Sequence, residues 1–228
     1  MKIQKQRRQG AFTLIELLVV ITIIAILASI ATPVMSKVQL SARMTKASSN
    51  ARNIFLACQL YAADSGGSYP EGEGTSNDAF RKLFPEYSEQ EEPFFLVQDK
   101  YFCRGGGADE NIGDPDSDSE STTSPEALKP GENHWAYVSG LLDTDNVNTP
   151  IIADGFTASN NTYDENHAWW KAKKAILIKL DGSQRREKIF KSGEVRVPDK
   201  NRNTNMFAAS ELERGRVLNP ALPNVSQP

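Results

Sequence analysis

The sequence predicts an α+β protein in which a long N-terminal helix packs on a small antiparallel β-sheet. An apolar run from Ala11 to Met35 is long enough for a helix, and apolar residues at helical spacing follow it as far as Tyr61. Short apolar stretches bounded by turn residues then predict strands. With 228 residues, of which 39% are hydrophobic, the chain has room for one medium-sized domain and an anchor.

The first eleven residues have the composition of a targeting leader. Lys2, Lys5, Arg7 and Arg8 precede the apolar run, and this segment contains no acidic residue. A secretory signal peptide, cleaved after Ser29-Ile30-Ala31, is one alternative, but its apolar core is normally about 7–15 residues long. The longer run here favours a segment that spans a membrane, for which about 20 residues suffice.

Glu16 is the one charged residue between Ala11 and Met35. A charge at the centre of a membrane-spanning helix costs about 2.5–3.5 kcal/mol, and less near the interface. A carboxylate in such a segment therefore indicates a functional site, unless it simply reaches the headgroup layer.

The string G-A-F-T-L-I-E, from Gly10 to Glu16, resembles the prepilin leader of type IV pilins and type II secretion pseudopilins. The resemblance implies that a prepilin peptidase removes residues 1–11 by cutting between Ala11 and Phe12, and that Phe12 is then N-methylated. Ala11 departs from the family, which most often has Gly before the cut. Cleavage after Gly10 is the alternative, but it gives the wrong spacing to Glu16.

The resemblance also gives Glu16 a role in filament assembly. Cleavage creates an α-amino group at Phe12 that is mostly cationic at neutral pH. This ammonium of one subunit would pair with Glu16 of a neighbour, and breaking such a buried pair costs about 3–5 kcal/mol. Residues 12–35 would form the transmembrane and filament-core helix, and Pro33, which many family members share, would kink it or mark the membrane exit.

Residues 36–63 are predicted to continue the same helix as an amphipathic half. Its apolar stripe has spacings of 3 or 4 residues and comprises Met44, Ala47, Ala51, Ile54, Cys58 and Tyr61. Gly66 and Gly67, followed by Pro70, predict the end of this helix.

Residues 64–228 are predicted to form an extracytoplasmic globular head. Its expected strands are Phe94–Val97, His134–Ser139, Pro150–Ala153 and Ala175–Leu180. Residues 105–130 have no apolar period and predict a long, exposed acidic loop, while the last dozen residues predict an extended tail. Several short stretches, including Ser48–Pro70, are similar to G-type pseudopilin-like proteins.

The charges of the head are segregated along the chain. Residues 64–126 carry 16 acidic and 4 basic side chains, and residues 171–217 carry 6 acidic and 13 basic ones. A nucleic-acid partner is not expected, because the basic residues alternate with acidic ones and no stacking motif accompanies them.

Few residues of the head suggest ligand chemistry, and no cofactor is expected. Calcium binding by Asp114, Asp116, Asp118 and Glu120 is an alternative to a solvated loop, although Ser119 and Pro125 occupy the Gly and Glu positions of an EF-hand. The two cysteines, Cys58 and Cys103, either form a disulfide or remain buried thiols. Together with His134 and His167 they lack the spacing of a zinc site.

The sequence supports a structural subunit rather than an enzyme, because it contains no recognisable catalytic or phosphate-binding motif. The resemblance implies a pseudopilin of a type II secretion-like machine, anchored in the inner membrane as a single-pass protein with its head in the periplasm or outside. Its partners would be copies of itself, other pseudopilins, prepilin peptidase and the assembly platform. A type IV pilus subunit and a membrane-anchored binding domain with a pilin-like leader are the alternatives.

Overall fold

The computed structural model describes residues 13–103, 127–196, 204–212 and 214–223. It divides into two compact units, Met1–Arg43 and Met44–Pro228. The first helix, α1 (Leu14–Asp64), belongs to both units, and a five-stranded sheet follows it in the second. This arrangement confirms the predicted α+β, pilin-like fold.

Helix α1 contains 51 residues, which corresponds to a length of about 76 Å at 1.5 Å per residue. It is long and apolar enough to cross a membrane, and its most apolar window is not buried within the protein. Large apolar side chains such as Leu14, Ile24 and Val38 are exposed there. This part of α1 therefore needs lipid or other protein chains to cover it.

The second part of α1 buries the predicted apolar stripe. Met44, Ala47, Ala51, Ile54 and Cys58 are all at most 3% exposed. Tyr61 is only half-buried, and Ala62 completes the contact instead. The helix ends where Gly66 and Gly67 adopt positive φ and the Gly67 amide donates to the carbonyl of Ala62, as the glycine pair predicted.

The sheet is antiparallel throughout, with the strand order β4-β3-β2-β1-β5. Its strands are β1 (Trp135–Ser139), β2 (Pro150–Asp154), β3 (Lys174–Lys179), β4 (Gln184–Lys188) and β5 (Arg216–Leu218). β1 and β2 are buried at every position, and β3 at all but its first, so both faces of the sheet are covered there. Burial of both faces explains the apolar runs at residues 135–138, 150–153 and 175–178.

Three of the four predicted strands are confirmed, as β1, β2 and β3. The prediction of a strand at Phe94–Val97 is wrong, because this segment forms turns in which the Asp99 amide donates to the carbonyl of Leu96. The edge strands β4 and β5 were not predicted. β4 has the sequence QRREK and owes its conformation to its pairing with β3 rather than to an apolar pattern.

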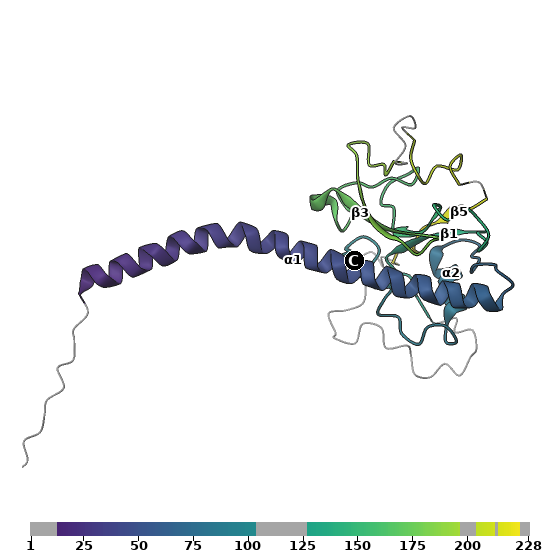
Figure 1. Ribbon diagram of the computed structural model, residues 1–228, viewed down its shortest axis with the longest axis horizontal. Helices are drawn as coiled ribbons and strands as arrows, with labels where there is room; N and C mark the ends of the chain where they lie inside the picture. Colours follow the sequence, from purple (N-terminus) through teal and green to yellow (C-terminus); the bar gives the residue numbers. More distant parts are fainter. Residues whose placement is uncertain (1–12, 104–126, 197–203, 213, 224–228) are drawn as a thin grey trace, which may run out of the picture. The chain divides into compact units, whose positions relative to one another are not determined.

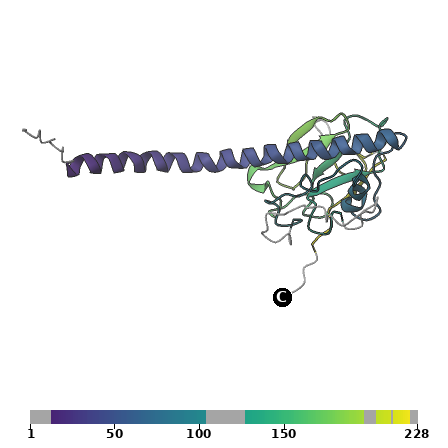
Figure 2. The same cartoon turned by 90° about the horizontal axis from the view of Figure 1, so that it is seen from below.

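The Met44–Asp64 part of α1 lies against the sheet, as Figure 1 and Figure 2 show from two directions. Two polar contacts fix it there: Gln184 of β4 donates to the carbonyl of Ser48 at 2.6 Å, and Arg186 donates to the Thr45 hydroxyl at 2.9 Å. Gly182, in the β3–β4 turn, approaches Phe55 so closely that an added Cβ would lie 3.1 Å from its ring.

The described part of the head also contains three short helices, α2 (Ser76–Phe80), η1 (Arg81–Leu83) and η2 (Trp170–Ala172). The core around α2 is aromatic. The centroid of the Phe80 ring lies 5.2 Å from that of Phe94 and 5.0 Å from that of Tyr137. Trp135 and Tyr137 are 1% and 0% exposed. They belong to the core of the head.

The structure describes parts of two segments that were predicted to be irregular. Within the expected loop 105–130, residues 127–130 are described, and Ala127 and Leu128 are buried because Asn77 and Arg81 donate to their carbonyls. The C-terminal residues were expected as an extended tail, but β5 pairs with β1. The Ala221 amide also donates to the Asn77 side chain at 3.0 Å, so the chain is held to the head up to this point.

Candidate functional site

The predicted assembly residue, Glu16, lies in the first turn of α1 and bonds to Thr13, which directly precedes the helix. One carboxylate oxygen accepts from both the amide and the hydroxyl of Thr13, at 2.8 Å each. The Thr13 hydroxyl oxygen in turn accepts from the Glu16 amide at 3.3 Å. This reciprocal arrangement is a capping box, in which the two side chains satisfy amides that have no partner within the helix.

The capping box gives Glu16 a defined position within its own subunit. The Glu16 side chain is exposed, and its bonds to Thr13 use one of its two oxygens, Oε2. A carboxylate has about four acceptor sites, so Glu16 can hold Thr13 and accept a further charged donor. Thr13 was not among the predicted site residues, although the pattern T-x-x-E before an apolar run indicates this cap.

The other residues predicted for the N-terminal site are only partly described. Ala11 and Phe12 lie outside the described residues, and Pro33 lies within α1, which continues past it. Whether Pro33 kinks the helix stays a prediction. The four acidic residues considered for calcium, Asp114, Asp116, Asp118 and Glu120, also lie outside the described part of the chain.

The disulfide considered from the sequence is not present, because Cys58 and Cys103 are free and buried. Cys58 faces the core from α1, whereas the Cys103 sulfur accepts from the Leu96 amide at 3.4 Å. The thiols therefore lie in different surroundings. Burial raises the pKa of both thiols, so they are poor nucleophiles.

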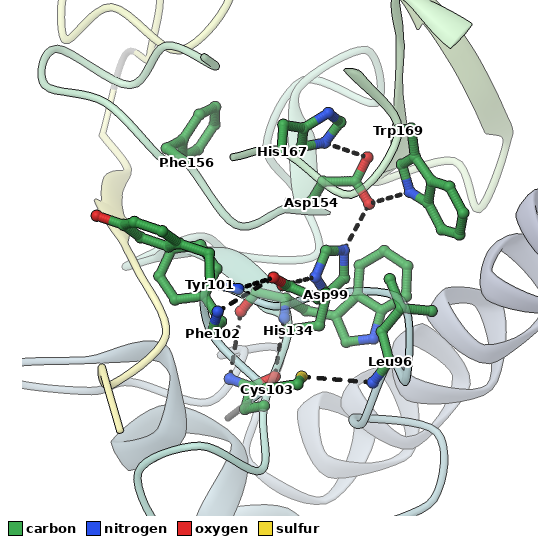
Figure 3. Close-up of polar contacts among 12 residues, drawn as sticks. Leu96, Asp99, Tyr101, Phe102, Cys103, His134, Asp154, Phe156, His167 and Trp169 are labelled. Carbon is green, nitrogen blue, oxygen red and sulfur yellow. Dashed lines mark hydrogen bonds and ion pairs between the residues drawn. The ribbon is translucent and has the colours of Figure 1, made fainter. Parts of the chain in front are cut away.

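The structure brings His134 together with two carboxylates in a buried network that the sequence did not reveal (Figure 3). His134 Nδ1 lies 2.5 Å from Asp99 Oδ2, and Nε2 lies 2.8 Å from Asp154 Oδ1. His134 directly precedes β1 and Asp154 is the last residue of β2, whereas Asp99 comes from the turn after Leu96. Since carboxylates only accept, both ring nitrogens must donate, and His134 is an imidazolium.

Asp154 is the most heavily bonded member of this network. Its Oδ1 accepts from His134 and from the Trp169 indole at 3.2 Å, as Figure 3 shows. Its Oδ2 accepts from His167 Nε2 at 3.2 Å and from the Ile176 amide of β3 at 2.7 Å. One carboxylate therefore links β2, β3 and the segment that carries His167 and Trp169.

Asp99 joins the network to the turn that contains Tyr101 and Phe102. Its Oδ1 accepts from the amides of Tyr101 and Phe102 at 2.8 and 3.1 Å. The carbonyl of His134 accepts from the Gly155 amide at 2.9 Å, and the His134 amide donates to the carbonyl of Phe94. These bonds fix the turn around residues 94–102 against the end of the sheet.

The charges and hydrogen bonds of the network shift the pKa values of His134 and Asp154. Burial alone lowers the pKa of His134, but the charge of Asp99 and the hydrogen bonds to Asp154 and Asp99 outweigh burial and raise it to about 9. Burial alone raises the pKa of Asp154, but hydrogen bonds from His134 and His167 outweigh it, so its pKa is well below the usual range. The pair is therefore ionised near neutral pH.

These bonds tie together segments of the head that lie far apart in the sequence. Neither nitrogen of the His134 imidazolium has a lone pair with which to accept a proton, so the ring is not a general base. His167 Nδ1 is buried without a hydrogen-bond partner in the part of the chain that the structure describes. Across those residues, no group of three or more His, Cys, Asp or Glu side chains is arranged to hold a metal ion.

Comparison with known proteins bears on the N-terminal site. None of the curated proteins or solved structures matches the chain significantly. The family model of the prokaryotic N-terminal methylation motif matches residues 6–32, which include the predicted cleavage site, Thr13 and Glu16. This motif, followed by an apolar helix and an antiparallel sheet, indicates the precursor of a type IV pilin-like protein or pseudopilin.

Proposed function

We propose that the chain is a pseudopilin, a structural subunit of a type II secretion-like filament whose assembly drives protein export. Prepilin peptidase cuts between Ala11 and Phe12, Phe12 is N-methylated, and the mature subunit stays in the inner membrane through the apolar part of α1. The head then lies in the periplasm. A type IV pilus subunit would share this N-terminal chemistry and differ in the filament that it builds.

The main support for the proposal is the position of Glu16. The residue lies in an exposed apolar helix, within the matched motif, and Thr13 fixes its carboxylate at the helix start. The ammonium of Phe12 in a neighbouring subunit supplies the counter-charge that a carboxylate needs in an apolar bundle. The pairing therefore sets the register between neighbouring subunits.

Two substitutions separate this role from helix capping. Glu16→Gln removes the charge but keeps a residue that a capping box accepts, whereas Thr13→Val removes the cap and keeps the charge. A cap contributes about 1 kcal/mol, and a buried ion pair costs about 3–5 kcal/mol to break. Glu16→Gln should therefore abolish assembly while Thr13→Val only weakens it, with Glu16→Asp in between.

The measurement is the amount of sheared or cross-linked multimer relative to total membrane protein, in a host with a prepilin peptidase. Intact mass should show a mature chain that begins at methylated Phe12 in every variant. Recovery of only the uncut chain, or wild-type assembly by Glu16→Gln, would contradict the proposal. If Glu16→Gln abolishes protein export while surface pili are still formed, the result supports the secretion role over a pilus.

A further inference from the structure

A groove on the head runs beside α1 and has a volume of about 350 Å³. Asn53, Leu56 and Leu60 of α1 line one side of it, and the segment from Tyr87 to Phe94 lines the other. Leu56 and Leu60 are one helical turn apart and are 45% and 59% exposed. Two large apolar side chains in an open groove indicate a surface for another protein chain.

Carboxylates lie in this groove and beside it. Glu89 lines it, and the Tyr87 hydroxyl, at its edge, donates to Asp64 at 3.2 Å. The pKa of Tyr87 is raised by desolvation, by this hydrogen bond and by the nearby charge of Glu86. The groove is therefore apolar inside and acidic at its rim, which favours an occupant that combines apolar and basic side chains.

Residues 34–43 of α1 have this combination. Val34, Met35 and Val38 are 56%, 57% and 57% exposed. Lys37 and Arg43 are exposed on the same helical segment, which contains no acidic residue. We propose that this groove binds residues 34–43 of α1 from a second copy of the chain, a contact that rests on the proposed filament.

Helix geometry places this contact with a different neighbour from the one that pairs with Glu16. In a filament whose α1 helices run parallel, a contact between Val38 and Leu56 requires an offset of 18 residues, or about 27 Å. Pairing of Phe12 with Glu16 requires an offset of only four residues, or about 6 Å. The groove therefore joins subunits farther apart along the filament, in addition to the N-terminal pairing.

Cysteine cross-linking tests the contact in the full-length chain. A chain that carries both Val38→Cys and Leu56→Cys should give a ladder of covalent multimers when filaments are oxidised in the membrane. The native thiols will not interfere, because Cys58 and Cys103 are 0% and 6% exposed. The control pairs Val38→Cys with Val147→Cys, a residue that is 54% exposed but does not line the groove, and should give no ladder.

Charge reversal independently tests the attraction between the basic residues of α1 and the acidic residues of the groove. Glu89→Lys and Lys37→Glu should each lower the yield of sheared filaments several-fold, and the double variant should recover most of that yield. If Glu16-dependent filaments form but the Leu56 pair cross-links no better than the Val147 pair, the groove contact is wrong and the proposed function stands. If the unaltered chain forms no filaments at all, both are wrong.

Discussion

Asp154→Asn should strongly destabilise the head, because the substitution removes a buried charge while preserving the shape of the side chain. Asp154 is completely buried, and its two oxygens accept from two donors each. An asparagine has only one oxygen. In either orientation of the amide, its NH₂ group would face two donors, either His134 and Trp169 or His167 and Ile176.

The loss of stability follows from the charge of His134, which stays buried without one of its two partners. Removing one partner of a buried ion pair costs about 3–5 kcal/mol, since the other charge remains buried. In a domain of this size, 1 kcal/mol shifts Tm by about 2–4 °C, so Tm should fall by about 6–20 °C. Asp99 would still face His134 at 2.5 Å, which keeps the loss within this range.

Urea unfolding of the full chain in detergent measures the change. The three tryptophans, Trp135, Trp169 and Trp170, all lie in the head, so their fluorescence reports on this unit alone. Asp181→Asn is the matched control, because Asp181 is exposed and an asparagine oxygen can still accept from the Ser183 amide. This control should unfold within about 0.5 kcal/mol of the unaltered chain.

If Asp154→Asn and Asp181→Asn unfold at the same urea midpoint with the same slope, the Asp154 carboxylate does not stabilise the head. An equal slope means that the same surface is exposed on unfolding, so a shift in midpoint can be read as a change in stability. A lower slope for Asp154→Asn alone would instead indicate a partly unfolded native state.

Three further predictions concern the head. Raising the pH from 7 to 10 should lower the free energy of unfolding by about 3 kcal/mol. The pKa of His134 is raised from 6.5 to about 9, so its charged form stabilises the head fully below pH 6.5, and this contribution is lost as the pH rises through 9. Urea midpoints across this range measure the loss, and a flat profile contradicts it. Cys58 and Cys103 should not react with a thiol reagent in the native chain, and both should react in urea; a native chain with no thiols in urea would mean a disulfide. Gly155→Ala should destabilise by about 1–3 kcal/mol, because its Cβ would lie 2.5 Å from the Phe102 ring; thermal unfolding beside the unaltered chain checks this.

Residues close together in the chain could be placed from the sequence. The stripe from Met44 to Cys58 and the turn at Gly66 depend on spacing within one helix, and β1, β2 and β3 depend on apolar runs between turn residues. The capping box could also be predicted from the sequence, because Thr13 and Glu16 are only three residues apart and have the T-x-x-E pattern of this motif.

The edge strands depend on their neighbours instead. β4 has charged residues at most positions, and a sequence of this kind is extended only when an adjacent strand supplies hydrogen bonds. β5 is short and lies in a segment with the composition of a tail, yet it completes the sheet beside β1. No apolar alternation marks either strand.

The apolar N-terminal segment, the position of Glu16 within it and the course of α1 could be predicted from the sequence, because they depend on hydropathy and on contacts within a few residues. The core of the head depends instead on contacts between segments that lie far apart in the sequence. His134 bonds to Asp99 and Asp154, which lie 35 and 20 residues away in the sequence. A charged residue is recognisable in a sequence, but whether it is solvated or buried against an opposite charge depends on which distant segments fold over it.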